Sequence, residues 1–342
     1  MPDISRRKFV KMAGVALAGV GLTGISEIVS DYGKEQASAL PAVKAASSKS
    51  VAEATEKSKV YFTKQIDAEH LIRLYEKVNA DIRGRVAVKL HTGEPHGPNI
   101  LPRDMVRAFQ AQIPNSTIIE ANVAYGGPRS TTPQHRETLA VNGWTFCPVD
   151  IIDEEGDVDF PVNGGLHLKE VAMGSHLANY DSLVVLTHFK GHAMGGFGGS
   201  LKNIAIGCAS GKVGKRQVHG LVDYGKWVTG GLFMELMADS GKAICDHFGK
   251  QIAFLNVLRR MSVDCDCAGT SAAEPVIPDL GMMASTDILA IDQASVDMVY
   301  NLKDSRKNDL IERIESREGL RQLTAMKELG MGSSRYELVS ID

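Results

Sequence analysis

The sequence predicts an α/β fold with a largely parallel sheet and flanking helices. Short β-branched and apolar runs alternate with helical segments along most of the chain, which is the pattern of βαβ units. Loops rich in glycine, histidine and lysine follow several of these runs, as expected at the carboxyl edge of an open parallel sheet. The 342 residues are 44% hydrophobic with a formal net charge of −3, which suits a globular core and gives no indication of a nucleic-acid partner.

The first 46 residues have the features of a twin-arginine (Tat) export signal. SRRKFVK at 5–11 precedes an apolar run over 12–25, which at about 14 residues is too short to span about 30 Å of hydrocarbon. Small residues allow cleavage after Ala39 or Ala46. We therefore expect the Tat translocase to export the folded protein to the periplasm or otherwise out of the cytoplasm, with no stable membrane span after cleavage.

The first half of the mature chain follows a linker over 47–58 that is rich in Ala, Ser and Lys. Asp67 is a candidate N-cap for the first helix, in which Leu71 and Leu74 share one apolar face. Apolar residues at helical spacing predict helices over 67–78, 102–112, 131–142 and 166–179. β-Branched and apolar runs predict strands over 86–90, 116–121, 144–149 and 182–186.

The pattern beyond residue 220 is less regular. We expect helices over 227–248, 289–302 and 307–329, and a strand over 252–257. One domain over 59–342 is the simplest division. A sub-division near residue 220, giving two lobes around a cleft, is the alternative.

The stretch THFKGHAMGGFGGSLKN at 187–203 is the most distinctive motif. It joins the predicted strand 182–186 to a predicted helix over 202–209, and glycine there lets backbone approach a ligand while a helix start attracts anions. Lys202 is followed by Asn203, and not by the Ser or Thr that a Walker phosphate loop needs, so a nucleoside-triphosphatase is excluded. A lysine at a helix start is also expected to have a lowered pKa and to contact an anion or carry a covalent group.

Three strand-end loops are rich in groups that bind anions or metals. The loop after the first strand holds Lys89, His91, Glu94 and His96, the second holds Arg129, and the fourth holds His188, Lys190, His192 and Lys202. Because the carboxyl ends of parallel strands meet at one edge, we expect these groups to converge. The candidate cofactor-binding residues are Lys89, Arg129, Lys190, Lys202, Gly198 and Gly199. His188 is a candidate metal ligand, and solvated loop charges or hydrogen-bonded histidines are the alternative.

The five cysteines are scattered and include no CxxC motif, so a ferredoxin-type 4Fe-4S cluster is not expected. SVDCDCAG at 262–269 places Cys265 and Cys267 two residues apart. In extended backbone both thiols would share one face and form half of a soft-metal site. Buried free cysteines are the alternative.

Four motifs together resemble the bacterial and archaeal family known as domain of unknown function 362 (DUF362). They are VKLHTGE at 88–94, THFKGHAMGGFGGSLKNIAIGCAS at 187–210, VDCDC at 263–267 and PDLGMMASTDILAIDQASVD at 278–297. The resemblance covers nearly the whole mature chain and implies an iron–sulfur-associated protein. Many members carry an inserted segment with cysteine clusters, which this sequence lacks around 220–248.

HAMGGFGGSLK at 192–202 also resembles the histidine, glycine-rich and lysine stretch of nickel-dependent lactate racemases. The resemblance implies that His192 is a catalytic acid/base and that Lys202 holds a nickel-pincer nucleotide covalently. It further implies that His219 is a nickel ligand, with His91 as candidate for the second catalytic histidine. Ser200-Leu201 departs from the glycine and arginine that are usual in that family.

These features together predict an exported protein that binds a metal (nickel, iron or zinc) or a metal cofactor. We expect an enzyme of the oxidoreductase or racemase/isomerase type that acts on a small anionic substrate by proton or hydride transfer. The alternative is a non-catalytic periplasmic protein for binding or assembling metal or iron–sulfur centres.

Overall fold

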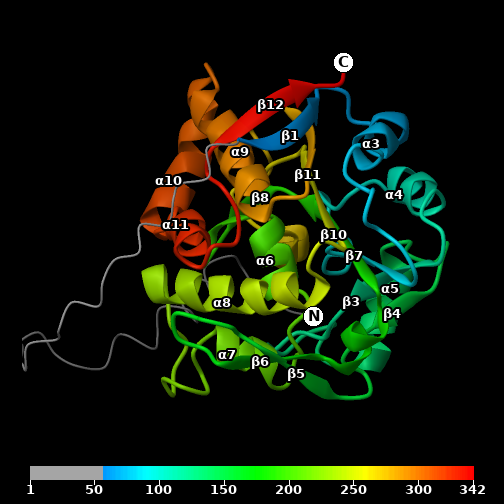
Figure 1. Cartoon of the computed structure of the whole chain (residues 1–342), viewed down its shortest axis with the longest axis vertical. Coiled ribbons are helices and arrows are strands. Elements are labelled where there is room, and N and C mark those ends of the chain that lie inside the picture. The colour runs from blue at the N-terminus through cyan, green and yellow to red at the C-terminus, as the bar shows by residue number, and fades with distance from the viewer. Residues whose placement is uncertain (1–56) are drawn as a thin grey trace, which may run out of the picture. The chain divides into compact units, whose positions relative to one another are not determined.

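A computed structural model describes residues 57–342 of the chain. The export signal predicted over 1–46 and nearly all of the linker predicted over 47–58 lie outside the described residues. The described part is one large, mostly parallel sheet with helices packed on both of its faces (Figure 1). The predicted α/β class is therefore confirmed.

The sheet has eight strands in the order β12-β1-β11-β10-β7-β2-β3-β4. Only the two pairings of β11 are antiparallel, and all other neighbours run parallel. The strands are β1 (Ser58–Thr63), β2 (Val86–Lys89), β3 (Ser116–Glu120), β4 (Val149–Ile151), β7 (Ser182–His188), β10 (Ile252–Leu258), β11 (Gly281–Ser285) and β12 (Tyr336–Ser340). The central strands β2, β7 and β10 are buried along their whole length, which explains their continuous apolar runs.

A separate hydrophobic core fills each face of the sheet. The neighbouring residues Val184 and Val185 of β7 belong to opposite cores, because successive side chains of a strand point to opposite faces. One core includes α3 (Ala68–Tyr75), α4 (Arg103–Gln110) and α5 (Thr132–Val141). The other includes α6 (Ser200–Ala205), α7 (Gly214–Val218), α8 (Gly230–Phe248), α9 (Ile288–Asn301), α10 (Asn308–Ser316) and α11 (Arg321–Glu328). Figure 1 shows α3 and α4 to the right of the sheet and α6 and α9 to its left.

Three predicted elements differ from the structure. The strand expected over 144–149 is displaced, because β4 spans Val149–Ile151 and only residue 149 belongs to both. The helix expected over 166–179 is wrong, because β6 (Glu170–Gly174) pairs with β5 (Asp157–Pro161) as an antiparallel ribbon and a 3₁₀ turn follows over Ser175–Asn179. Tertiary pairing decides this, since β6 is hydrogen-bonded along its whole length to β5. The helix expected over 307–329 is divided into α10 and α11. The edge strand β12, its neighbour β1 and the antiparallel β11 were not predicted.

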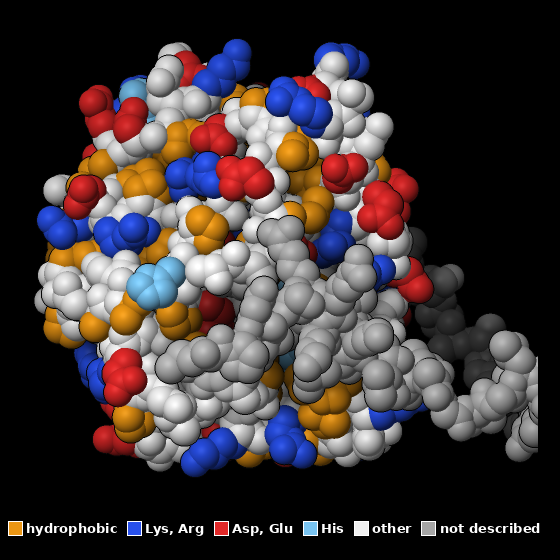
Figure 2. Space-filling model, turned by 180° about the vertical axis from the view of Figure 1, so that it is seen from behind, with side chains coloured by type: hydrophobic (Ala, Val, Ile, Leu, Met, Phe, Trp, Pro, Cys, Tyr) orange, Lys and Arg blue, Asp and Glu red, His pale blue; other side chains and the backbone are white. Residues whose placement is uncertain are grey.

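The surface of the described residues mixes both signs of charge. On the face seen in Figure 2, Lys and Arg side chains lie among Asp and Glu side chains. Among residues 57–342, no helix is both long enough and apolar enough to cross a bilayer.

Candidate functional site

The carboxyl ends of four strands and their loops surround one cavity of about 200 Å³. β2 leads to His91, β3 ends at Glu120, and β7 leads through the small ribbon of β8 (Lys190–His192) and β9 (Gly196–Gly198) to Lys202. β10 leads to the loop that carries Cys267. Parallel strands bring these loops to one edge, although their residues are far apart in the sequence.

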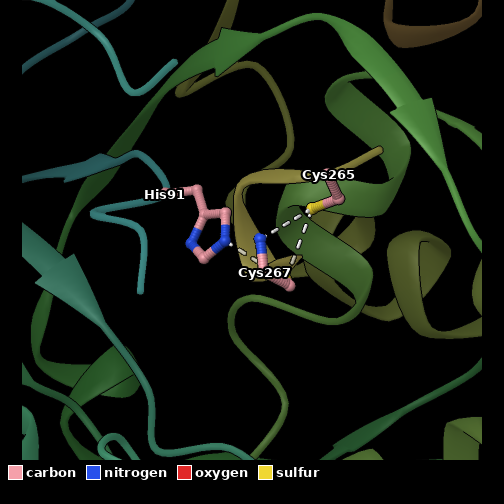
Figure 3. A group of neighbouring side chains, drawn as sticks. All are labelled: His91, Cys265 and Cys267. Atoms are coloured by element: carbon pink, nitrogen blue, oxygen red, sulfur yellow. Dashed lines mark hydrogen bonds between the residues drawn. The ribbon is translucent and has the colours of Figure 1, made fainter. Parts of the chain in front are cut away.

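His91, Cys265 and Cys267 form a compact group of metal-type donors. The Sγ atom of Cys267 lies 3.2 Å from His91 Nε2 and 3.3 Å from Cys265 Sγ, and the donor atoms of all three residues lie within 4.8 Å of one another. Figure 3 shows the histidine and the two cysteines converging on this point from separate segments of the chain. Cys265 is the cap of the 3₁₀ helix η3 (Asp266–Ser271), whose tight first turn brings the two sulfurs together.

The two cysteines share one proton. The Cys265 thiol donates to Cys267 and lowers the pKa of Cys267 well below its ordinary value, and the charges of Lys202 and His91 lower it further against the opposing effect of burial. The same hydrogen bond, together with burial, raises the pKa of Cys265. Cys267 is therefore the thiolate, and it is the sulfur that lines the cavity.

Glu120 sets the orientation of His91. Its buried carboxylate accepts from Lys89 Nζ at 2.8 Å and from the Thr92 amide at 2.8 Å, and it lies 3.3 Å from His91 Nδ1. A proton on Nδ1 directs Nε2 of His91 at the Cys267 thiolate. Two electron-rich atoms 3.2 Å apart need a cation between them, either a proton or a metal ion, and metal bonds of about 2.0–2.3 Å suit this spacing.

The structure brings most of the predicted site residues to this cavity. Its lining includes Lys89, His91, Arg129, His192, Lys202, His219 and Cys267. His219 lies on the wall, outside the group of three donors. Arg129 donates from Nε to Glu94 at 2.9 Å, so its charge is already partnered.

His188 and Lys190 do not reach the cavity. His188 Nδ1 lies 2.8 Å and Lys190 Nζ 3.0 Å from the Asp266 carboxylate, and His188 Nε2 donates to the Arg259 carbonyl at 2.7 Å. With both ring nitrogens engaged, His188 has no free donor for a metal. Burial would raise the pKa of Asp266, but the charges of His188 and Lys190 outweigh it and lower that pKa. His188 and Lys190 thus hold Asp266 in place, and with it the turn that carries the two cysteines.

The candidate cofactor-binding glycines Gly198 and Gly199 are not part of the cavity lining. A Cβ on Gly199 would come within 2.5 Å of the Asp292 carboxylate, which accepts from the amides of Ser200 and Leu201 at 2.7 and 2.9 Å. The expectation that amides at this helix start hold an external anion is therefore wrong for these two. A Cβ on Gly198 would make only ordinary contacts, the closest at 3.7 Å from the Lys202 side chain.

Lys202 is held as a cation. Its Nζ lies 3.5 Å from Cys265 Sγ and 3.9 Å from Cys267 Sγ. Burial lowers the pKa of Lys202, but the two sulfurs more than compensate, so the pKa is raised. The expected lowering is wrong, because the sequence does not reveal which groups face the amine.

His192 offers a donor to the cavity. Its Nδ1 accepts from the Gly195 amide at 2.8 Å and from the Met194 amide at 3.3 Å, which leaves the ring proton on Nε2. Burial, reinforced by the charge of Lys202, lowers the pKa of His192 to about 3. His192 is therefore neutral near pH 7 in this arrangement.

His219 offers the complementary acceptor. Its Nδ1 donates to the Lys215 carbonyl at 2.6 Å, so the lone pair is on Nε2. The ring lies beside Trp227 and Phe233, with centroids 4.4 and 5.0 Å away, and burial lowers its pKa to about 4. The cavity lining thus includes a neutral donor and a neutral acceptor.

Sequence reasoning missed Glu120, Lys215 and the role of Asp266. The signal for Glu120 is a carboxylate that closes the apolar strand STIIE, where a charge needs a buried partner. Asp266 lies between the two cysteines in the sequence, and this position is the signal that links it to them. Nothing near Lys215 in the sequence marks it as a cavity residue.

Comparisons with known proteins place the chain in a family. The family model described as "Domain of unknown function (DUF362)" matches residues 86–297. Two solved structures are similar: the lactate racemase apoprotein from Thermoanaerobacterium thermosaccharolyticum, with 12% identity and a TM-score of 0.40, and a Thermotoga maritima protein, with 11% identity and a TM-score of 0.41. The matches cover 71% and 70% of this chain but only 57% and 60% of those chains. No curated protein matches. Since the family model spans more than half of its length, the chain belongs to the DUF362 family.

Proposed function

We propose that the protein binds one soft or borderline metal ion through His91, Cys265 and Cys267, and that it acts on a small organic anion in the adjoining cavity. The observation that carries this proposal is the Glu120-oriented His91, whose Nε2 faces the Cys267 thiolate at 3.2 Å. Thiolate and imidazole donors favour zinc, nickel, iron or copper over magnesium and calcium.

Three protein donors leave a coordination position open. Structural zinc sites are closed by four protein ligands, whereas catalytic sites keep one position for water or substrate. Cys267 lines the cavity, so the open position would face it. This supports an enzyme over the alternative of a non-catalytic metal-binding or assembly protein. When bound, the metal would polarise a substrate oxygen or nitrogen.

The cavity residues supply the rest of the chemistry. Lys215 lines the cavity without a carboxylate partner among residues 57–342, which favours an anionic ligand. Apolar residues such as Val123, Ile206 and Trp227 line the remainder. His192 can donate a hydrogen bond, while His219 Nε2 can accept a proton, so proton transfer at the substrate is the reaction type that these groups suit best.

A covalent nickel-pincer-type cofactor at Lys202 is a narrower form of the same proposal. The charged state of Lys202 argues against it, because an ammonium group is not a nucleophile. Intact-mass measurement of the purified protein decides this point, since an organic adduct would add a fixed mass that Lys202→Arg removes.

Metal analysis of purified variants tests the proposal. We expect about one equivalent of metal in the wild type and a loss of most of it in Cys267→Ser and His91→Gln. The matched control is His176→Gln, since His176 forms a second His and carboxylate group with Asp150 and Glu154 that is partly exposed. The control should keep its metal. A Cys267→Ser protein with the wild-type metal content and a wild-type melting temperature would overturn the proposal.

A further inference from the structure

The cations of the cavity are not equivalent. Lys89 is paired with Glu120 at 2.8 Å, and Arg129 is paired with Glu94 at 2.8 Å. Lys202 faces the two sulfurs. Each of these charges is balanced by an anion of the protein itself.

Lys215 is different. It lies in α7, is only 5% exposed and lines the cavity, yet its Nζ donates to a single protein acceptor, the Ala209 carbonyl at 2.7 Å. Within residues 57–342, no carboxylate lies within ion-pair distance of this amine. A buried amine with one neutral acceptor has little to stabilise its charge.

The packing of α7 holds Lys215 in place. A Cβ on Gly214 would come within 1.8 Å of the Ala172 carbonyl oxygen, so this end of α7 is pressed directly against β6. The Ser210 carbonyl and hydroxyl accept from the amides of Lys215 and Gly214 at 2.8 and 3.0 Å. Burial lowers the pKa of Lys215 to about 8, with Lys89 adding to the effect and Asp153 opposing it. Near neutral pH, part of the population therefore carries a neutral, nucleophilic amine.

We infer that Lys215 forms an imine with a carbonyl compound that carries a carboxylate, that is, with a 2-oxo acid. This rests on the proposed function, because it names the class of anion that the cavity takes. The carboxylate would lie among the cavity-lining side chains Lys89, Arg129 and Lys202, which keep positive charge beside it even though each has a protein partner, and the carbonyl carbon would meet the amine.

The step needs no further reactant. The lone pair of the neutral amine forms a bond to the carbonyl carbon, and the carbon–oxygen bonds break. The oxygen leaves as water with the two amine hydrogens. Nothing is oxidised or reduced. The resulting imine, once protonated, withdraws electrons from the adjacent carbon, and the neutral Nε2 of His219 is the cavity group able to accept a proton.

Reductive trapping tests the inference. The full protein is incubated with pyruvate and sodium cyanoborohydride at about pH 8, where the neutral fraction of Lys215 exceeds that of an ordinary lysine by roughly a hundredfold. Peptide mapping should locate the reduced adduct on Lys215, labelled at least about tenfold faster than exposed Lys212. Lys215→Arg should abolish this labelling and Lys212→Arg should not. Acetone, which has the carbonyl without the carboxylate, should label Lys215 more slowly.

Three outcomes would overturn the inference: labelling at Lys202 in place of Lys215, equal labelling of Lys215 and Lys212, or no adduct on Lys215. Metal content and melting temperature measured on the same samples separate the two proposals. A metal-loaded, folded wild type with no adduct on Lys215 refutes the imine alone. A metal-free wild type refutes the proposed metal site, whatever is found at Lys215.

Discussion

At the scale of single residues, Glu120 positions more of the site than any of the three proposed metal ligands does. One buried carboxylate balances Lys89, orients His91 and accepts from the Thr92 amide. Burial alone would raise the pKa of Glu120, yet Lys89, His91 and Arg129 together lower it well below its usual range. The carboxylate is therefore ionised near neutral pH.

Glu120→Gln should weaken both metal binding and stability. The amide is isosteric but uncharged, so it leaves Lys89 buried without its counter-charge and His91 without its orienting partner. We expect about 10- to 100-fold weaker metal binding and a loss of about 3–5 kcal/mol in the free energy of unfolding of the metal-free protein. Metal titration and urea unfolding measure the two effects.

Glu154→Gln is the control for this change. Glu154 pairs with Arg136 at 2.7 Å, but the Arg136 side chain is 50% exposed. Its loss should cost no more than about 1 kcal/mol and leave metal binding unchanged. Wild-type metal affinity in Glu120→Gln would show that His91 is not oriented by this carboxylate.

At the scale of elements, the junction of β9 and α6 determines where Lys202 stands. α6 starts with its amides bound to Asp292, a residue of α9 that also accepts from Asn256 at 2.9 Å. The carboxylate fills the place that a side chain of residue 199 would need. Glycine is required at this position by a close approach, since its φ of −100° is open to any residue.

Gly199→Ala should therefore destabilise the protein, whereas Gly198→Ala should not. Asp292 cannot move away from a new methyl group without breaking its hydrogen bonds, and such overpacking costs about 1–3 kcal/mol. At Gly198 the nearest atom to a new Cβ is 3.7 Å away, so the change should stay within about 1 kcal/mol. Thermal melting of the two variants compares neighbouring positions in one junction. Equal melting temperatures would contradict the tight contact with Asp292.

The same carboxylate predicts a pH dependence. Burial raises the pKa of Asp292 from 3.8 to about 6, against its hydrogen bonds with Leu201, Asn256 and Ser200. The folded state thus keeps its proton to a higher pH than the unfolded state. The contribution of this group to stability is complete below about pH 4 and is lost as the pH rises through about 6.

Asp292→Asn removes this titration. Between about pH 4 and pH 7, the wild type should lose up to about 3 kcal/mol of stability relative to the variant. Because other titrating groups are common to both proteins, the difference in their urea unfolding free energies isolates Asp292. A difference that does not change with pH would contradict the raised pKa.

At the scale of the whole molecule, the described residues behave as one unit. β10 and β11 lie beyond residue 220 in the sequence, yet β10 pairs in parallel with β7 and β11 pairs with β1. A division at residue 220 would cut through the central sheet. We therefore expect cooperative unfolding without a separately stable lobe.

The variant Trp227→Phe tests this cooperativity. It leaves Trp144, which is buried in the core that includes α3, α4 and α5, as the only tryptophan. Its fluorescence and the far-UV circular dichroism of all the helices should report the same urea midpoint. Two separate midpoints would support the alternative of two lobes.

The elements that could be predicted are those determined by residues close together in the sequence. The runs at 86–90, 116–121, 182–186 and 252–257 correspond to β2, β3, β7 and β10, because buried parallel strands are continuous apolar segments. The segment 166–179 misled the prediction, since its apolar spacing fits a helix while its partner β5 imposes a strand. β1 and the edge strand β12 were not predicted because their burial alternates weakly.

By itself the sequence determined the α/β class, the strand-end loops that carry histidine, lysine and arginine, and the two cysteines spaced to act together. These are local patterns. Because the carboxyl ends of parallel strands meet at one edge of a sheet, the sequence also predicts that the loops share that edge, but no more than that. The tertiary structure alone decided which side chains meet there. His91 and Cys267 are 176 positions apart, and contact between them depends on strand order and on the turn held by His188, Lys190 and Asp266. The tertiary structure also decided which groups are protonated, because the pKa values of Cys267 and Lys202 depend on partners that are distant in the sequence.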